Sequence, residues 1–451
     1  MSYLKNPKIT RKQGKKTKHQ KELDSLPVIN RFNENVISNE KDVQEFEDEI
    51  YNEEIKATIR KIYEPNLRNL LKGCYQCGSC SSVCQLSKVQ KYTPSKIIYQ
   101  ILVGLEDNIL KSGILWDCTT CNTCLQNCPE LISFAELVRN ARYKMRKLYN
   151  QTPQDFFAHE GIFLTISEIM SKEGIQPTKN LEWIPEGCEI TDKGKILYFM
   201  GCIPFFNFEF RDLTPIAAGS LKLIHSIEKE PIVILKDEIC CGHDLYWGHG
   251  KLETFIRLAR KNFKLFKNAG VSNIITSCAE CYRTLKFDYP KIFDDFDEKF
   301  KISHLIEYIY ENWKQNKIKF KRPNGNNGLI RFSYHDPCRL SRFLPRENKI
   351  LDNLREIFEH LKQYGYEFNE MEHNKQDSLC CGVSCWMNCN ESSKALRYKR
   401  LLEAKSAGNM LVSSCPKCLI HLSCAQSDFN DVSTIEIIDF AEFLINSIDF
   451  L

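Results

Sequence analysis

Cysteine is the residue type that could do chemistry here, since the chain has 22 of them among 451 residues. Ten of them have another cysteine separated by two residues, a spacing that suits metal ligation better than disulfide pairing between neighbours. Disulfide scaffolds also belong mainly to small secreted domains, whereas this chain is long enough for several packed cores. We therefore expect the cysteines to bind metal in an intracellular protein.

Two runs share the spacing C-x2-C-x2-C-x3-C, one over 74–84 and the other over 118–128. This spacing wraps a 4Fe–4S cube with three thiolates from one turn, and in two-cluster ferredoxins the fourth cysteine ligates the other cube. Zinc sites, the alternative, usually use separated pairs of ligands. By this rule one cubane cluster takes Cys74, Cys77, Cys80 and Cys128, and the other takes Cys118, Cys121, Cys124 and Cys84.

The segments around the two runs predict helices. Pro94–Leu110 has apolar residues at helical spacing, and a second helix is expected over Phe134–Leu148. Gln85 follows the last cysteine of the first run, where ferredoxins usually have a proline, as the second run does at Pro129. This change weakens a turn but removes no ligand.

The C-terminal half carries one cysteine pattern twice, with corresponding cysteines 136 to 140 residues apart. A cysteine comes first, then a Cys-Cys-Gly triplet, then a C-x2-C pair. The first copy has Cys202, Cys240, Cys241, Cys278 and Cys281, and the second has Cys338, Cys380, Cys381, Cys415 and Cys418. Gly242 and Gly382 give the backbone freedom to turn and leave room beside a metal.

Short apolar segments precede these cysteines and predict α/β domains. Helices are expected to stop at Ala269-Gly270 and Ala407-Gly408, with glycine in a left-handed cap. The ligands would gather at the carboxyl ends of strands, the usual place for sites in open α/β sheets. The predicted strands are Ile196–Met200, Ile232–Leu235, Asn273–Ser277, Leu329–Tyr334 and Met410–Ser413.

Six further residues lie near the pattern without belonging to it. Cysteines 188, 385, 389 and 424 are predicted to be structural, because free buried cysteine is common. His243 and His335 lie within three positions of expected ligands. A structural hydrogen bond is the favoured role for both, over a bond to cluster sulfur or a proton for a leaving thiolate.

Composition favours no particular macromolecular partner, because the formal net charge is only +4. Eight of the first 21 residues are Lys or Arg, with no aromatic residue among them beyond Tyr3, so we expect a mobile tail and no nucleic-acid binding. We see no signal peptide and no membrane span, since the longest apolar stretch, Ile196–Phe206, is too short. The expected localisation is cytoplasmic, reaching the inner face of the membrane only through a partner.

The predicted fold class is α + α/β, a mainly helical two-cluster ferredoxin domain followed by two repeated α/β cysteine-rich (CCG) domains. No G-x-G-x-x-G follows a strand, so we expect this chain to bind no flavin and no nucleotide. The predicted domains are a polar, disordered tail over 1–55, the ferredoxin domain over 56–150, a linker over 151–194, and CCG domains over 195–322 and 323–451.

These two cysteine patterns together resemble the D-type polypeptide of heterodisulfide reductase. In that polypeptide a ferredoxin domain, like that of the C-type polypeptide, precedes a CCG domain like that of the B-type polypeptide. The wider CCG superfamily, which includes iron–sulfur subunits of glycolate and lactate oxidases, is similar at His335-Asp336-Pro337-Cys338. The resemblance to the D type is carried by Cys-Tyr-Gln-Cys-Gly-Ser-Cys at 74–80, Thr-Pro-Ser-Lys at 93–96, Gly-Leu-Glu-Asp at 104–107, Trp-Asp-Cys-Thr-Thr-Cys at 116–121 and both five-cysteine sets.

The resemblance implies that each five-cysteine set binds a noncubane 4Fe–4S cluster and that a disulfide is cleaved between the two. The expected activity is that of a heterodisulfide-reductase-like oxidoreductase subunit, with the CoM–CoB heterodisulfide or a similar thiol pair as substrate. Electrons would come from a flavoprotein or a membrane b-type cytochrome. The alternative is a non-catalytic electron-transfer subunit of a flavin-dependent glycolate- or lactate-type dehydrogenase, or of a membrane redox complex.

Overall fold

The computed structural model of the chain describes residues 53–151, 161–172, 181–202, 213–323, 328–382, 385 and 389–450. The tail expected over 1–55 lies almost entirely outside these residues. Residues 58–451 form one compact unit. Within the described part of the chain, no helix is both long and apolar enough to span a membrane.

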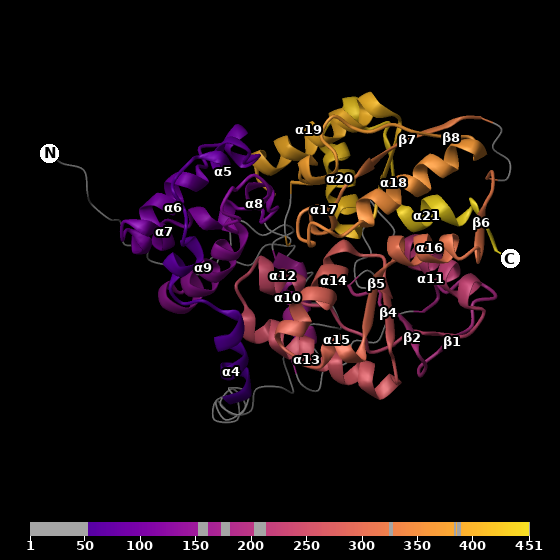
Figure 1. The fold of residues 1–451 in the computed structure, drawn as a ribbon, viewed down its shortest axis with the longest axis horizontal. Helices are drawn as coiled ribbons and strands as arrows, with labels where there is room; N and C mark the ends of the chain where they lie inside the picture. The colour runs from indigo at the N-terminus through magenta and orange to yellow at the C-terminus, as the bar shows by residue number, and fades with distance from the viewer. Residues whose placement is uncertain are drawn as a thin grey trace, which may run out of the picture. The chain divides into compact units, whose positions relative to one another are not determined.

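The N-terminal domain is helical, as predicted (Figure 1). Each cysteine run contains one short helix, α5 in the first and α8 in the second, and these two helices pack against each other. The helices are α4 (Glu53–Ile62), α5 (Ser79–Ser82), α6 (Pro94–Leu102), α7 (Glu106–Ser112), α8 (Thr123–Gln126) and α9 (Phe134–Tyr149).

The helix predicted over Pro94–Leu110 is two helices, so that prediction is wrong in its middle. The chain breaks between α6 and α7 because Gly104 adopts a φ of +95°, which a right-handed helix does not allow. The helix predicted over Phe134–Leu148 is confirmed as α9, which begins where the Ser133 side chain accepts a hydrogen bond from the Glu136 N–H.

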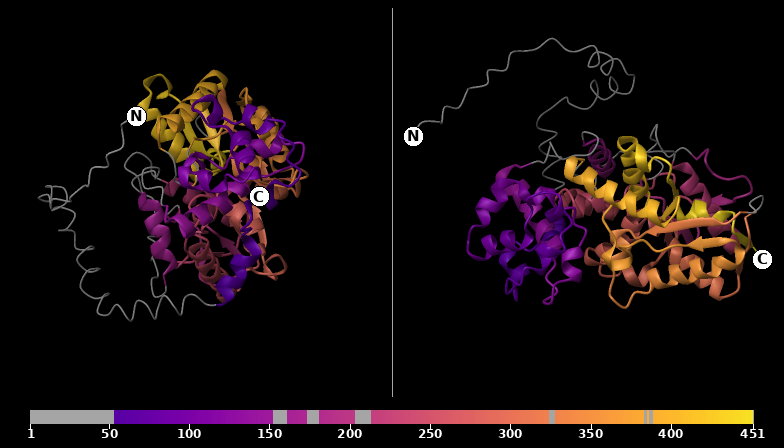
Figure 2. Two further views of the ribbon diagram at one scale, coloured as in Figure 1. Left: turned by 90° about the vertical axis from the view of Figure 1, so that its left-hand side faces the viewer. Right: turned by 90° about the horizontal axis from the view of Figure 1, so that it is seen from above.

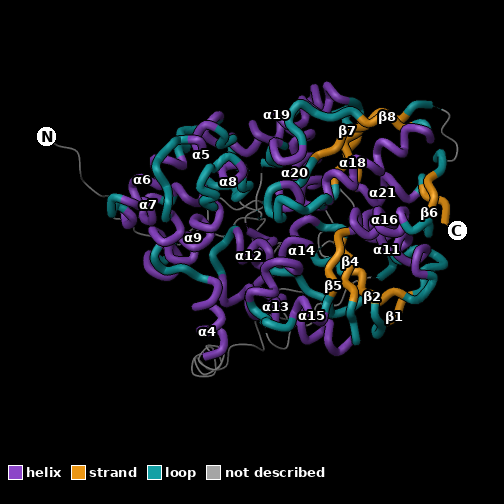
Figure 3. Tube along the Cα trace, viewed as in Figure 1, coloured by secondary structure: helices purple, strands orange, loops and turns teal. Residues whose placement is uncertain are grey.

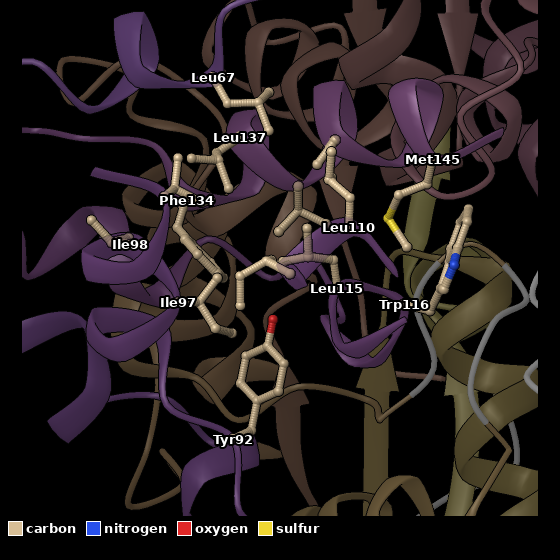
Figure 4. Close-up of a cluster of buried hydrophobic side chains, with 14 of the residues drawn as sticks. Leu67, Tyr92, Ile97, Ile98, Leu110, Leu115, Trp116, Phe134, Leu137 and Met145 are labelled. Carbon is tan, nitrogen blue, oxygen red and sulfur yellow. The ribbon is translucent and has the colours of Figure 1, made fainter. Parts of the chain in front are cut away.

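A core of aliphatic and aromatic side chains holds these helices around the two cysteine runs (Figure 4). Leu110, Leu115 and Leu137 are completely buried in it. Several of the cysteines pack against its edge, so burial of this apolar surface also positions the runs.

The first α/β region is built on a five-stranded parallel sheet in the order β1-β3-β2-β4-β5 (Figure 3). Its strands are β1 (Ile190–Thr191), β2 (Ile196–Tyr198), β3 (Ile232–Val233), β4 (Asn273–Thr276) and β5 (Lys301–His304). Its helices are α11 (Thr214–Glu228), α12 (His243–Trp247), α13 (Leu252–Ala269), α14 (Ala279–Arg283), α15 (Phe296–Lys299) and α16 (Leu305–Lys314), and α10 (Ile162–Ser171) packs on α13.

The second α/β region has a parallel sheet in the order β10-β9-β7-β8, which repeats the order β5-β4-β2-β3 of the first. Its strands are β7 (Ile330–His335), β8 (Tyr366–Phe368), β9 (Met410–Ser413) and β10 (Glu436–Asp439). Its helices are α17 (Cys338–Ser341), α18 (Ile350–Leu361), α19 (Glu391–Ala407), α20 (Pro416–Asp428) and α21 (Phe440–Ile445).

The two copies contact each other reciprocally. Helix α11 packs on α21 and α18 packs on α16, which is one contact repeated with the copies exchanged. An antiparallel pair, β6 (Ile318–Phe320) with β11 (Ile448–Phe450), also joins the end of the first copy to the end of the second. The duplicated sequence therefore folds as an approximate two-fold pair. The right-hand view of Figure 2 shows the helical domain, indigo to purple, at one end of these two copies.

Two predictions about glycines differ from the structure: the left-handed cap at Gly408 and the open space beside Gly242 and Gly382. Gly270 ends α13 in the left-handed region, as predicted, but Gly408 is extended with φ 167° as the chain leaves α19 for β9. Gly242 and Gly382 both have φ +82° and permit the expected turn. The space they leave is filled by the protein, because an added Cβ would lie 2.8 Å from Phe255 or 2.6 Å from Arg397.

Candidate metal centres

The first cysteine run lies at the surface. Cys74, Cys77, Cys80 and Cys128 line one cavity, which brings together the four residues expected to share a cube. Tyr75 and Cys77 are exposed to solvent, Tyr75 to 61%. The loop turns tightly because Gln76 and Gly78 have positive φ angles.

The second run has the same backbone turn in different surroundings. Thr120 and Asn122, at the positions of Gln76 and Gly78, also have positive φ angles, but both are buried. Cys84 lies near this run, since charge on Cys84 and on Cys121 adds to burial in raising the pKa of Cys118 to about 12. The structure thus places Cys84 with Cys118, Cys121 and Cys124.

Arg142 ties the second run to the first CCG domain. Its side chain is 1% exposed, and it donates to the carbonyl oxygens of Leu115, Trp116 and Cys118. Those three bonds come from Nη2. The Nη1 nitrogen donates to the carbonyls of Trp247 and Gly248, at the end of α12. One buried guanidinium therefore satisfies five carbonyls of two domains.

Two more buried arginines connect the run to the second CCG domain. Arg339 donates to the Thr120 carbonyl at 2.8 Å, and Arg342 donates to the Cys121 carbonyl at 2.7 Å. Arg339 lies on α17, next to Cys338, and Arg342 directly follows that helix. The second run is thereby held next to the first cysteine of the second CCG set.

Gln85 makes a fourth connection. Its side-chain oxygen accepts from the Cys380 N–H at 2.7 Å, and its side-chain nitrogen donates to the Ser378 carbonyl. The residue that replaces the ferredoxin proline therefore pairs with the backbone of the second Cys-Cys-Gly triplet, a role that spacing alone did not indicate.

The first CCG set is a connected group of buried thiols at the carboxyl ends of strands. Cys202 follows β2 and Cys278 follows β4, so the predicted position at strand ends is confirmed. Thiols within hydrogen-bonding reach of each other are Cys202 and Cys240, Cys240 and Cys241, Cys241 and Cys281, and Cys281 and Cys278.

The second set is similar and meets the first. Its buried thiols are linked in the order Cys380, Cys381, Cys418 and Cys415, and Cys415 also contacts Cys278. Cys338 is only half-buried, and burial with nearby charge on Cys381 and Cys121 raises the pKa of its thiol to about 11. The second ferredoxin run is thus close to the second CCG set.

A buried charged group lies where the two sets meet. Glu280 and Lys417 occupy the same place in the two C-x2-C pairs, and Lys417 forms ion pairs with Glu280 at 2.5 Å and with Asp244. Burial alone would lower the pKa of Lys417, but the two carboxylates hold it well above its usual value. Burial raises the pKa of Glu280 to about 8.

The two histidines singled out from the sequence are both buried next to arginine. His243 accepts a hydrogen bond from Arg339 at Nε2, and its Nδ1 faces the Thr284 hydroxyl at 2.7 Å. His335 accepts from Arg400 at Nδ1. Spacing did not single out His421, which lies three residues after a ligand on α20 with its Nδ1 3.6 Å from the Cys381 sulfur.

The four remaining cysteines have differing environments. Cys385 is fully buried, with its carbonyl facing His249 Nε2 at 2.8 Å and its sulfur 3.9 Å from Arg339. Cys389 is exposed, and Cys188 and Cys424 are half-buried.

The donor sets fit iron–sulfur clusters. Thiolates are the soft ligands that such clusters require, and here the cysteines of each run and of each CCG set lie near one another, although Cys338 meets its set only near Cys381. Buried guanidinium groups lie beside the second run and the second CCG set, as expected where clusters with negative charge are held.

Comparison with known proteins agrees with this arrangement. The 4Fe-4S dicluster domain model matches residues 70–132, and the cysteine-rich domain model matches 196–286 and 332–423. The D-type polypeptide of the dihydromethanophenazine:CoB–CoM heterodisulfide reductase of Methanosarcina acetivorans is 26% identical, over 73% of this chain and 76% of its own. An iron–sulfur protein of Methanocaldococcus jannaschii is 26% identical, over 86% of this chain and 74% of its own.

A more distant relative is an EtfAB:quinone oxidoreductase of Syntrophomonas wolfei, 24% identical over 75% of this chain and 47% of its own. A solved structure of a Helicobacter pylori protein aligns over 87% of this chain and 76% of its own, with 12% identity and a TM-score of 0.46. A dicluster domain followed by two cysteine-rich domains places the chain in the iron–sulfur oxidoreductase family with the fused architecture of the D-type polypeptide of heterodisulfide reductase.

Proposed function

We propose that this chain is the subunit of an iron–sulfur oxidoreductase that carries single electrons through its ferredoxin domain to the paired CCG sites and there reduces a disulfide. The substrate would be the CoM–CoB heterodisulfide or a similar pair of low-molecular-weight thiols. The observation that carries this proposal is that the two CCG sets meet at one buried place. Lys417 of the second C-x2-C pair forms ion pairs there with Asp244 and Glu280 of the first copy, and Cys415 lies near Cys278.

Each cysteine group has a role in this proposal. Two cubane clusters would be held by Cys74, Cys77, Cys80 and Cys128, and by Cys84, Cys118, Cys121 and Cys124. Two noncubane 4Fe–4S clusters would be held by Cys202, Cys240, Cys241, Cys278 and Cys281, and by Cys338, Cys380, Cys381, Cys415 and Cys418. When bound, the clusters supply one-electron transfer, and those of the CCG domains also supply open iron sites for sulfur.

The arrangement of the protein supports a direction for the electrons. The first run is exposed at Tyr75 and Cys77, so a donor can approach it. The second run is held against the second CCG domain by Arg339, Arg342 and Gln85. Electrons would therefore enter at the first run and leave from the second.

A disulfide needs two electrons and two protons to become two thiols, whereas iron–sulfur clusters deliver electrons singly. Two adjacent sites can store one electron each, and this supports reduction of a disulfide between them. The chain itself excludes water from this place, since both C-x2-C pairs and Lys417 are buried.

The test is disulfide-dependent oxidation of a reduced viologen by the anaerobically purified full chain, which should contain about sixteen iron atoms. Turnover with the CoM–CoB heterodisulfide or another small disulfide supports the proposal. A protein with full iron content that oxidises the dye with none of the disulfides tested contradicts it.

Within the same proposal, Cys278→Ala should remove the signal of the first noncubane cluster and leave both cubane signals in the electron paramagnetic resonance (EPR) spectrum. The cubane ligands pack against the N-terminal hydrophobic core, to which Cys278 does not belong, so they should not depend on this thiol. Loss of all four signals together would mean that folding, and not local ligation, depends on Cys278.

A second candidate function is a non-catalytic electron-transfer subunit working with a flavin-dependent dehydrogenase or a membrane redox complex. The similarity to the EtfAB:quinone oxidoreductase favours it. In that case the full chain would pass electrons between a reduced flavoprotein and a quinone analogue, and no disulfide would be consumed. Both candidates need an electron partner, either a flavoprotein or a b-type cytochrome at the inner face of the membrane.

A further inference from the structure

The two CCG copies differ at one pair of positions beside their thiols. Tyr198 and Tyr334 are equivalent, since each lies near the end of a central strand and hydrogen-bonds a serine, Ser277 or Ser414, at 3.0 Å. The next residue is Phe199 in the first copy and His335 in the second, each three residues before a cysteine of its set.

The partner of this position differs as well. Arg400 on α19 and Asn262 on α13 each lie eight residues before the glycine that follows their helix. Arg400 donates to His335 Nδ1 at 3.0 Å, whereas Asn262 donates to the Cys240 carbonyl. The second copy thus has a His–Arg pair where the first has Phe and Asn.

Arg400 determines which nitrogen of His335 carries the proton. A guanidinium only donates, so Nδ1 must accept, and a neutral imidazole then has its proton on Nε2. The neutral ring is favoured because His335 is 1% exposed and a guanidinium already donates to it. Among the described residues no nitrogen or oxygen pairs with Nε2.

Thiols are what the ring faces instead. A ring nitrogen of His335 and the sulfurs of Cys381 and Cys418 all lie within 4.8 Å of one another. His421 adds a second imidazole to Cys381, and its equivalent in the first copy is Thr284, three residues after the C-x2-C pair. No imidazole occupies either of these two positions in the first copy.

The first set faces a different balance of charge. Asp244 and Glu280 approach it with Lys417 between them, so the ammonium group beside the first set is paired with acidic side chains. The second set faces Arg339 and Arg342 near Cys338 and two imidazoles near Cys381. Negative charge disfavours adding an electron, while N–H donors to sulfur favour it.

We propose that His335, oriented by Arg400, donates an Nε2–H···S hydrogen bond to Cys381 and makes the second CCG site the easier of the two to reduce. This inference rests on the proposed function only in requiring that both sets hold a cluster. With clusters bound, an electron from the second ferredoxin run would then occupy the second CCG site before the first. His335 acts here as a positioning residue, through the sulfur that it contacts.

The experiment is an EPR-monitored redox titration of the reconstituted full chain. His335→Leu should lower the midpoint potential of one noncubane signal and leave the other three unchanged, because it removes the N–H donor from one site. His335→Gln, whose amide N–H can take the place of Nε2–H, should restore most of the shift. Phe199→Leu is the matched control in the first copy and should leave the second site's potential unchanged.

Two results would overturn the inference. One is a His335→Leu protein with all four signals at wild-type potentials. The other is strong ¹⁵N coupling in pulsed EPR, after labelling with ¹⁵N-histidine, that disappears in His335→Leu, since that would make His335 an iron ligand and not a hydrogen-bond donor. The expected result is only weak nitrogen coupling, part of which His335→Leu removes and part of which His421 retains.

The design separates this inference from the proposed function. If the wild-type protein lacks iron at the CCG sets, the proposed function fails before any potential is compared. If His335→Leu does not assemble, Arg400→Met provides the second variant. It keeps the imidazole but releases its tautomer, so it should move the same midpoint potential in the same direction by less, and an unchanged potential would contradict the inference.

Discussion

The two ferredoxin runs have the same cysteine spacing and the same backbone turn, but opposite surroundings. Tyr75, Gln76 and Cys77 of the first run are exposed, whereas Thr119, Thr120 and Asn122 of the second are buried. The ligand pattern therefore specifies a cluster at each run, while contacts from distant residues decide which run faces solvent. Under the proposed function, that difference would set the direction of electron transfer.

The contacts that distinguish the second run are polar and come from far along the chain. Arg142 reaches it from α9, and Arg339 and Arg342 reach it from the second CCG domain. Each guanidinium is buried. Arg142 and Arg342 donate to backbone carbonyls, and Arg339 donates to the Thr120 carbonyl and to side chains. Removing one leaves carbonyls without donors in a place that water does not reach, so the second run should be the more sensitive of the two.

The largest expected effect is that of Arg142→Met. Five carbonyls lose their donor, so the free energy of unfolding should fall by about 4 kcal/mol. Denaturant unfolding followed by circular dichroism measures this change, and EPR should show the second-run cubane lost before the first. Arg68→Met is the control, because exposed Arg68 donates to the Ile101 carbonyl at the surface. Equal destabilisation by both variants would contradict the comparison.

The next largest effects are expected from replacing the fourth cysteine of each run, and they test which cubane cluster each of these cysteines binds. Cys84→Ser should remove the cubane of the second run, and Cys128→Ser should remove that of the first, because these cysteines lie with the opposite run. EPR of the reduced proteins distinguishes the two signals through relaxation by added paramagnetic ions, which act more strongly on the exposed cluster. Loss of the exposed signal in Cys84→Ser would mean that each run holds its own cube.

Spacing predicts most of what lies within a few residues of a cysteine. The runs, the duplicated set and the position of Cys278 and Cys415 after strands all follow from local pattern. The break of the predicted helix at Gly104 and the extended Gly408 were missed, since glycine permits several backbone conformations and the surroundings choose one.

Contacts between residues far apart in the chain could not be predicted from the spacing of the cysteines. From the sequence, Gln85 was expected only to weaken a turn, but its side chain accepts a hydrogen bond from Cys380, 295 residues away. Lys417 could be seen as part of a C-x2-C pair, yet the carboxylates of Asp244 and Glu280 that surround it are in the other copy. The same holds for His335, whose nearness to a ligand was visible while Arg400 was not.

Gln85→Leu should have a moderate effect on the connection between the second run and the second CCG site. Loss of the hydrogen bonds to Cys380 and Ser378 leaves two buried backbone groups unpaired and should cost about 2 kcal/mol. Rapid mixing with dithionite should show unchanged reduction of the cubanes but slower reduction of the second CCG site. Gln76→Leu is the matched control on the exposed run, and an equal slowing there would refute a specific role for Gln85.

Tyr75→Ser is expected to have the smallest effect on the protein. It is also the sharpest test of whether electrons enter at the exposed first run. Tyr75 is exposed beside Cys77, so its removal should leave the unfolding midpoint and all four EPR signals unchanged. Exposed tyrosines often provide much of the contact with a partner protein, so reduction by a soluble ferredoxin should slow about fivefold. Reduction by dithionite, a small reagent that needs no docking surface, should keep its rate. Tyr99→Ser, also exposed but on α6, is the control, and equal slowing by both variants would mean that the donor does not approach at the first run.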